Sequence, residues 1–261
     1  MDIFASRALA AYCVSVALLF GAVMGSFLNC AAWRIARGES FVRGRSRCPA
    51  CSHTLGPADL VPVLSWVFSR GRCRYCGAPV SVRYPVTELL CAALTVSCLL
   101  RFGLSALCAR NYVFVCCLFC LSLVDLDVCE IPDGCLLISA AAWFAALPFL
   151  RVGARAALGN VLAGLCTGAA LLLMSMAMDR ALGRESMGGG DIKLFAVVGL
   201  YLGATATLFA LLLSCVLGLV FAAATGAGRS RPFPFGPSVA AAACVLLFGG
   251  DALTAWYWNL F

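Results

Sequence analysis

Charged residues are scarce in this 261-residue chain, where Asp, Glu, Lys and Arg together make up only 12%. A soluble domain usually carries about 25% charged residues. Histidine occurs once, as His53, and lysine once, as Lys193. A histidine-based catalytic triad would therefore have to be built around a single imidazole. The hydrophobic fraction is 63% and the mean hydropathy is +0.98. These values exclude an ordinary soluble enzyme, a disordered protein and a fibrous repeat, and they indicate a membrane protein.

Long apolar runs predict an all-α polytopic membrane protein with about eight transmembrane helices. A membrane-crossing helix needs about 20 mostly apolar residues, and the runs cover about 9–32, 85–100, 112–124, 135–150, 158–178, 192–225 and 239–258. The run 192–225 is too long for one span without strong tilt, so we expect two short helices with a break near 201–204. The first run lacks the basic flank and cleavage site of a signal peptide, so we expect it to be retained.

Basic residues are distributed unevenly between the connecting segments. Fourteen of the 19 fall in three of them, namely Arg34, Arg37, Arg43, Arg45, Arg47, Arg70, Arg72, Arg74, Arg83, Arg180, Arg184, Lys193, Arg229 and Arg231. Eight spans place all fourteen on one side of the membrane, whereas seven would divide them. The positive-inside rule assigns the richer side to the cytoplasm. The net charge of +7 is therefore a signal of topology, and we expect no nucleic-acid partner.

The 17 cysteines fall into two groups. Thirteen lie in or beside apolar runs, where a thiol behaves as a small hydrophobic group. The other four form two CxxC pairs in the basic loop, Cys48–Cys51 and Cys73–Cys76. This spacing predicts one structural Zn²⁺ held by four thiolates, which would stabilise a small zinc-ribbon-like domain. Redox-active or spare cysteines remain the alternative, and with four thiols available His53 is not needed as a ligand.

Two acidic residues stand at the ends of apolar helices. Asp125 follows directly on one apolar run, and an ionisable group at that depth is costly unless it has a function. Asp127 lies two residues on, so the two side chains face roughly opposite sides of a helix. Asp133 follows Pro132, which marks a break and makes it a loop or helix-start residue.

The second acidic feature is Asp191, which follows three glycines and opens the next apolar helix. Glycines allow the backbone to approach another segment closely. With eight spans, Asp125 and Asp191 come to the same side of the membrane. Two close carboxylates share a proton, so one can act as general base on a water while the other donates to a peptide carbonyl. The residues alone leave a second reading open, in which these aspartates only cap helices or pair with basic groups.

Six motifs in this order resemble the prepilin peptidase (type IV leader peptidase) family, membrane aspartic proteases of the GxGD class. They are Gly25-Ser-Phe-Leu-Asn29 with Arg34, the two CxxC pairs, Arg83-Tyr-Pro85 with Glu88, Asp125-Leu-Asp127 with Ile131-Pro-Asp133, Gly188-Gly-Gly190-Asp191 with Lys193, and Pro234-Phe-Gly-Pro237. One departure is Ser186, where the family commonly has glycine before the methionine.

The resemblance implies that Asp125 and Asp191 form the catalytic dyad, with Gly188, Gly190 and Lys193 in the supporting loop. It implies cleavage of a short basic leader from prepilins and pseudopilins, after a glycine, at the cytoplasmic face of a bacterial inner membrane. It also implies N-methylation of the new N-terminus with S-adenosylmethionine, a role associated with the region of Asn29, Arg34 and Glu88.

The expected organisation is a first transmembrane helix in 1–33, a cytoplasmic four-cysteine zinc domain in 34–84, and a peptidase membrane domain of about seven helices in 85–261. Two alternatives remain for the function. One is a leader peptidase without methyltransferase activity, in which Asn29 and Glu88 only join helices or pair with arginines. The other is a non-catalytic membrane assembly or transport protein with a structural zinc domain.

Overall fold

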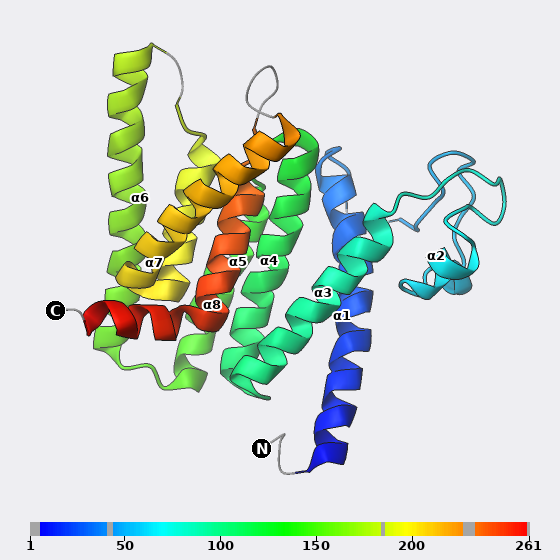
Figure 1. Ribbon diagram of the computed structural model, residues 1–261, viewed down its shortest axis with the longest axis horizontal. Helices are drawn as coiled ribbons and strands as arrows, with labels where there is room; N and C mark the ends of the chain where they lie inside the picture. The colour runs from blue at the N-terminus through cyan, green and yellow to red at the C-terminus, as the bar shows by residue number, and fades with distance from the viewer. Residues whose placement is uncertain (1–5, 41–43, 184–185, 227–232, 260–261) are drawn as a thin grey trace. The chain divides into compact units, whose positions relative to one another are not determined.

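The computed structural model describes residues 6–40, 44–183, 186–226 and 233–259. These residues form an all-helical fold (Figure 1). The helices are α1 (Arg7–Ile35), the short 3-10 helix η2 (Pro57–Asp59), α2 (Leu64–Phe68), α3 (Arg83–Phe102), α4 (Ala106–Val128), α5 (Asp133–Leu150), α6 (Ala154–Leu182), α7 (Gly189–Thr225) and α8 (Gly236–Trp258). Within the described residues, seven of them are long and apolar enough to cross a membrane. The chain divides into two compact units, 1–112 and 113–261.

In the first unit, α1 and α3 form a closely packed antiparallel pair. A Cβ added to Gly21 would lie 2.6 Å from the Ala92 backbone, and one added to Gly25 would lie 2.8 Å from Cα of Glu88. Residue numbers increase along α1 as they decrease along α3, so the two helices run in opposite directions. Two glycines one turn apart on one face of α1 thus let the backbones approach closely.

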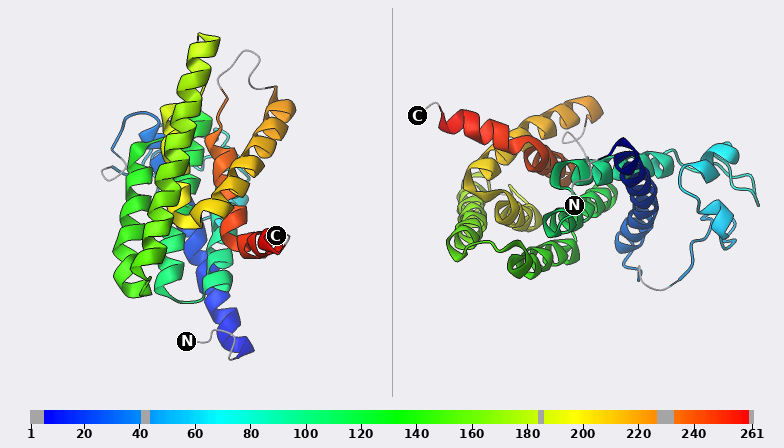
Figure 2. Two further views of the ribbon diagram at one scale, coloured as in Figure 1. Left: turned by 90° about the vertical axis from the view of Figure 1, so that its left-hand side faces the viewer. Right: turned by 90° about the horizontal axis from the view of Figure 1, so that it is seen from below.

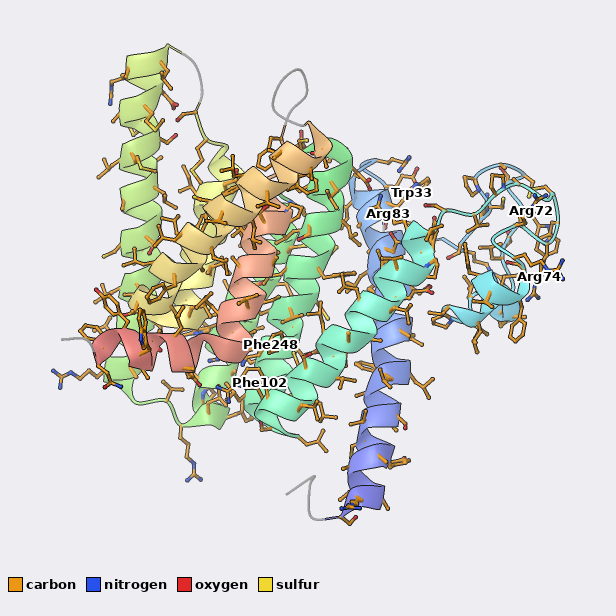
Figure 3. The ribbon with its side chains drawn as sticks, viewed as in Figure 1. Trp33, Arg72, Arg74, Arg83, Phe102 and Phe248 are labelled. Carbon is orange, nitrogen blue, oxygen red and sulfur yellow. The ribbon has the colours of Figure 1, made fainter. Side chains whose placement is uncertain are left out.

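The loop between α1 and α3 carries η2 and α2 and little other regular structure. It begins and ends at one end of the helix pair, where the labelled Trp33 and Arg83 lie near each other (Figure 3). The Trp66 indole N–H donates to the Val80 carbonyl at 3.0 Å, and its ring covers Gly71, whose φ is +66°. A Cβ at Gly71 would lie 2.9 Å from that ring, so this turn requires glycine.

The second unit holds the rest of α4 and helices α5 to α8. Helices α6 and α7 cross closely, because a Cβ added to Gly199 would lie 2.6 Å from Cα of Gly164. The ring of Tyr201 on α7 stacks on Phe114 of α4 with centroids 3.9 Å apart. Its hydroxyl donates to the Ser139 carbonyl of α5 at 2.8 Å. Tyr201 therefore ties three helices together in the core of this unit.

Helix α7 is broken where the sequence predicts a break. Gly203 has φ 74° and ψ 178°, which is not helical, and the carbonyl of Gly203 accepts a bond from Thr207 just beyond it. The arms 189–202 and 204–225 run in opposite senses, so both ends of α7 lie at one end of this unit (Figures 1 and 2). Counting the two arms separately gives the eight segments that the arginine pattern favours.

The basic residues counted for the topology lie partly within the structure. Arg43, Arg184, Arg229 and Arg231 lie outside the described residues. Arg72 and Arg74 extend from the cysteine-containing loop (Figure 3). Arg74 lies 3.5 Å from the Asp59 carboxylate, so this arginine is paired with an acidic group of its own loop.

Candidate active site and metal centre

Asp125 lies near the end of α4 and is buried, since only 4% of the residue is exposed. Its carboxylate accepts a hydrogen bond of 2.7 Å from the backbone N–H of Gly236, the first residue of α8. Amides at a helix N-terminus have no partner within the helix and carry partial positive charge. The start of α8 is therefore the group that satisfies and orients the Asp125 carboxylate.

Glycine is the residue type that fits position 236 at this contact. A Cβ at that position would lie 2.8 Å from Oδ2 of Asp125 and 3.2 Å from its Cγ. The Pro-Phe-Gly-Pro motif at 234–237 thereby gains a physical reason. Its glycine lets the helix start approach the carboxylate, and Pro237 occupies a first-turn position where a missing N–H has no consequence.

Asp191 lies in the first turn of α7 and is partly buried. Its N–H donates to the Gly188 carbonyl at 3.1 Å, which closes the turn that begins the helix. A Cβ added to Gly188 would lie 3.4 Å from the Asp191 carboxylate. One added to Gly190 would lie 3.0 Å from Ile131 of the segment between α4 and α5. The glycines thus bring this turn close to the chain that follows Asp125.

The two predicted catalytic residues come together at one end of the second unit. The carboxylates of Asp125 and Asp191 are close enough to interact electrostatically. Asp127 is exposed while Asp125 is buried, as the helical periodicity predicts. Two carboxyl groups at one end of the unit, one buried and one partly buried, have the composition that general acid-base hydrolysis requires.

Lys193 and Asp133 join the two segments that carry the aspartates. Nζ of Lys193 lies 2.8 Å from Oδ1 of Asp133 and 3.0 Å from Oδ2. Asp133 is the first residue of α5, after Pro132, which agrees with a helix start at this position. Both side chains are about 60% exposed, at 59% and 62%, so the pair positions the segments without deep burial.

Ser186 is anchored to the end of α6. Its N–H and its hydroxyl each donate to Oδ1 of Asp179 at 2.7 Å. Asp179 also accepts the Gly183 N–H through its carbonyl at 2.9 Å, where the chain leaves the helix. The serine that departs from the family pattern therefore adds a hydroxyl bond to Asp179 that glycine cannot form, whereas the N–H bond is open to either residue.

The four loop cysteines meet at one point. The sulfur atoms of Cys48, Cys51, Cys73 and Cys76 all lie within 4.8 Å of one another, and those of Cys48 and Cys76 are 3.9 Å apart. Tetrahedral Zn–S bonds of about 2.3 Å require S···S separations of about 3.8 Å. Among the described residues, this is the group that could hold a metal, and its spacing and ligand chemistry fit zinc.

The two CxxC pairs have matching backbone geometry. The Cys48 N–H donates to the His53 carbonyl at 3.0 Å, and the Cys73 N–H donates to the Ala78 carbonyl at 2.8 Å. Each turn then closes with a left-handed residue, Ser52 at φ 57° and Gly77 at φ 74°. Backbone N–H groups of Cys51 and Ala50 bond to the Cys48 thiol and lower its pKa to about 7. The amides of this turn thus favour the thiolate form of Cys48 that binds metal. Without a metal, the Ala78 amide acts to lower the pKa of Cys76, but burial and the neighbouring thiols instead raise it to about 11.

His53 does not join the cysteine cluster. Its ring stacks on Tyr75 with centroids 3.6 Å apart. The Tyr75 hydroxyl donates to Asp59 at 3.0 Å, and this bond raises the pKa of Tyr75. Asp59 also accepts the Gly56 N–H at 3.0 Å, so it connects the turn at η2 with the second CxxC pair.

The three residues assigned to the methyltransferase region separate into two locations. Asn29 and Glu88 are buried on the facing surfaces of α1 and α3. Arg34 lies beyond them at the end of α1, where its guanidinium donates to the carbonyls of Ser40 and Arg45, both at 3.3 Å. Arg34 therefore holds the chain that leaves α1, and Glu88 accepts the N–H of Val63 in the loop at 2.7 Å.

Three contacts were missed by the sequence analysis. The motif containing Gly236 is visible in the sequence, but nothing there connects it with Asp125, 111 residues away. The bond from Val63 to Glu88 involves a backbone amide and has no sequence signal. Asp179 carries a detectable signal, because an acidic residue in the last turn of a helix opposes the helix dipole and calls for a local partner.

Comparisons with known proteins identify relatives over nearly the whole chain. A family model described as Bacterial Peptidase A24 N-terminal domain matches residues 19–102, and one described as Type IV leader peptidase family matches residues 112–223. A Bacillus subtilis (strain 168) protein named prepilin leader peptidase/N-methyltransferase is 35% identical over 249 residues, covering 94% of this chain and 97% of that protein. Proteins of the same name from Aeromonas hydrophila and Stutzerimonas stutzeri are 35% and 32% identical, and the matches cover 93% and 94% of this chain and 93% of each relative. No solved structure matches the chain at a significant level.

Proposed function

Because this chain belongs to the type IV leader peptidase family, we propose that it cleaves the leader from prepilins and pseudopilins with Asp125 and Asp191. The observation that carries this proposal is the placement of both aspartates at one end of the second unit, where the glycine turn before Asp191 packs against Ile131 of the chain that follows Asp125. The relatives named prepilin leader peptidase/N-methyltransferase match this chain over almost their full length.

The reaction requires two carboxyl groups that share one proton. The ionised carboxylate removes a proton from a water molecule, whose oxygen attacks the carbonyl carbon of the scissile peptide. The protonated carboxyl donates to the carbonyl oxygen, and the C–N bond then breaks as the nitrogen takes up a proton. The amide of Gly236 fixes the orientation of one carboxylate, and the turn of Gly188 and Gly190 positions the other.

Replacing each aspartate with asparagine tests this proposal, since asparagine keeps the size and polarity but cannot take up the proton. We expect Asp125→Asn and Asp191→Asn each to abolish cleavage of a purified prepilin in detergent or membranes. The matched control is Asp251→Asn on α8, which should cleave as the wild type does. Cleavage by both single variants at the control rate would show that the dyad is assigned wrongly.

The four-cysteine loop supports one structural zinc ion, held by Cys48, Cys51, Cys73 and Cys76. A site with four protein ligands has no open position for substrate, so the zinc stabilises the domain of residues 34–84 rather than taking part in the reaction. Metal analysis of protein purified under reducing conditions without chelator should give one zinc per chain. Protein without zinc under those conditions would exclude this assignment.

Methylation of the new N-terminal amine is the second proposed activity, and the names of the relatives include N-methyltransferase. S-adenosylmethionine would supply the methyl group. Mass spectrometry of the mature substrate separates a bifunctional enzyme from a peptidase alone, because each methyl group adds about 14 Da. An unmethylated N-terminus produced by enzyme that cleaves, with the methyl donor present, would leave only the peptidase.

The multi-pass helical fold places this enzyme in a membrane, and we assign it to the bacterial inner membrane with the dyad at the cytoplasmic face. The support is the positive-inside rule applied to the arginine-rich segments. A peptidase at this face meets the leader before the mature part of its substrate leaves the membrane. Protease accessibility of the loop at 36–82 in sealed inside-out vesicles tests the orientation.

A further inference from the structure

Asn29 and Glu88 are buried polar residues on the facing surfaces of α1 and α3. Their residues are 3% and 6% exposed, respectively. They lie in the first unit with the cysteine loop, and the proposed peptide-cleavage step does not use them. Buried polar groups in a membrane protein are rare unless they bind something or join helices.

The helix geometry brings the two side chains toward each other. Gly21, Gly25 and Asn29 share one face of α1 because they are spaced by four residues. Gly25 touches the backbone of Glu88, and Asn29 lies one turn, about 6 Å, further along α1. Side chains tilt toward the N-terminus of their own helix. Since the helices are antiparallel, Glu88 leans toward the level of Asn29, and Asn29 leans back toward Glu88.

Asn29 has an unused donor at this place. Its amide nitrogen Nδ2 is buried and has no hydrogen-bond partner within the described part of the chain. A buried donor without a partner is unfavourable. If Asn29 served only to join α1 to α3, this nitrogen would be bonded across the interface. Its place one turn from the level of Glu88 and its lack of a partner indicate a group that a ligand with an oxygen acceptor completes.

Glu88 has a partner, but that partner is neutral. Its Oε2 accepts the Val63 N–H at 2.7 Å. Neither of the ion pairs described above, Arg74–Asp59 and Lys193–Asp133, includes Glu88. A buried carboxylate is favourable only when a positive charge or several donors compensate it. The site therefore offers a negative charge to a positively charged ligand group.

The segment held by Glu88 is strained. Val63 has φ 60° and ψ −51°, and the Leu64 N–H donates to the Pro62 carbonyl at 2.6 Å. This is the rarer γ-turn with positive φ, which a β-branched residue adopts at a cost. Strained backbone persists where the surroundings hold it, often beside a functional site. The hydrogen bond to Glu88 thus holds this γ-turn in place, and it also fixes the position of one oxygen of Glu88.

We propose that Asn29 and Glu88 form a binding site for an α-ammonium group with a neighbouring oxygen acceptor, as found at the amino end of a peptide or in a free amino acid. Glu88 binds the ammonium group, and Nδ2 of Asn29 donates to the carbonyl or carboxylate oxygen beside it. This inference rests on the proposed methyltransferase function, which involves two ligands of this chemistry. One is the N-terminal residue of the cleaved prepilin, and the other is the amino-acid end of S-adenosylmethionine.

Two pairs of probes separate these sources in binding measurements on the full-length enzyme in detergent. The first pair is a synthetic peptide with the mature N-terminal segment of a prepilin, with its amine either free or acetylated. The second pair is S-adenosylhomocysteine and 5′-methylthioadenosine, which lacks the amino-acid end. Within the pair that the site binds, the wild type should prefer the member with the free ammonium group about tenfold or more, as expected for a charged hydrogen bond.

The variant Glu88→Gln keeps an oxygen for the Val63 N–H but removes the charge. It should reduce that preference to about one, and the matched variant Glu39→Gln, at an exposed position after α1, should keep it. Asn29→Leu removes the unpartnered nitrogen, so it should weaken binding while leaving the melting temperature unchanged or raised. A residue that only joined helices would instead lower the melting temperature when replaced and leave ligand binding intact.

The outcomes distinguish this site from the proposed function. A lost preference in the peptide pair assigns the site to the substrate amine, and one in the nucleoside pair assigns it to the methyl donor. If the wild type discriminates within neither pair, or Glu88→Gln leaves the preference unchanged, the site is refuted even when the enzyme cleaves and methylates. If the wild type cleaves but never methylates a prepilin, the methyltransferase function fails independently of these binding results.

Discussion

Replacement of Gly236 by alanine should impair cleavage through Asp125. The added Cβ would lie 2.8 Å from Oδ2, 3.2 Å from Cγ and 3.3 Å from Cβ of Asp125. All three distances are shorter than ordinary van der Waals contact, so the carboxylate or the start of α8 must move. The backbone at Gly236 does not have positive φ, so the effect comes from this contact and not from strain of the main chain.

The movement breaks or lengthens the 2.7 Å hydrogen bond from the Gly236 amide. A hydrogen bond to a charged group contributes about 1.5–3 kcal/mol. If this contribution is lost from the reacting state, kcat/KM falls by about 10- to 150-fold. The assay is cleavage of a purified prepilin by solubilised enzyme, with kcat/KM measured at equal concentrations of folded protein.

Gly249→Ala is the matched control on the same helix, because a Cβ there has nothing within 4 Å. Alanine in a helix interior is favoured over glycine by about 0.5–1 kcal/mol, so this variant should cleave normally and melt no lower than the wild type. Zinc content and methylation of a precleaved substrate report on the first unit and identify any general misfolding. If Gly236→Ala cleaves within threefold of Gly249→Ala, the contact with Asp125 has no role in the reaction.

Three further predictions concern the cysteine loop and the ion pair beside the dyad. Ser52→Gly should make the loop retain zinc longer against a chelator, and Gly77→Ala should shorten retention. The reason is that left-handed backbone costs an L-residue about 1–2 kcal/mol. Equal zinc retention in the two variants would refute the matching of the two turns. Cys48→Ser should release the metal and increase proteolysis of the loop, while a zinc-replete variant with unchanged proteolysis would contradict its role as a ligand. Lys193→Gln and Asp133→Asn should each reduce cleavage, with a coupling of about 0.2–1 kcal/mol, or about 1.4- to 5-fold, for an exposed pair; additive effects in the double variant would exclude the interaction.

The sequence predicts the helices well because the bilayer imposes their length and composition. Each predicted apolar run lies inside a helix of the structure, and the helices extend a few residues beyond the runs. These extensions contain polar residues such as Asp191, which hydropathy alone does not assign to a helix. The break near Gly203 was predictable from the length of the run, since a glycine stands where the chain must turn.

The site was predictable in part. Asp125 and Asp191 could be selected because carboxylates are costly beside apolar helices, and the cysteine spacing indicates a metal site directly. The contacts that orient these groups could not be predicted, because they depend on close approach between distant segments. The Gly236 amide on Asp125 and the Val63 amide on Glu88 are examples, and both involve backbone atoms that every residue type except proline provides.

The reversal at Gly203 decides on which face the chain emerges before α8. At 1.5 Å per residue, an unbroken helix of 37 residues would be about 55 Å long, nearly twice the hydrocarbon thickness of about 30 Å. Without the turn, Asp191 and the first amide of α8 would be delivered to opposite faces, and Gly236 could not reach Asp125. The reversal of chain direction at Gly203, 12 residues after Asp191, is therefore a condition for assembling the active site.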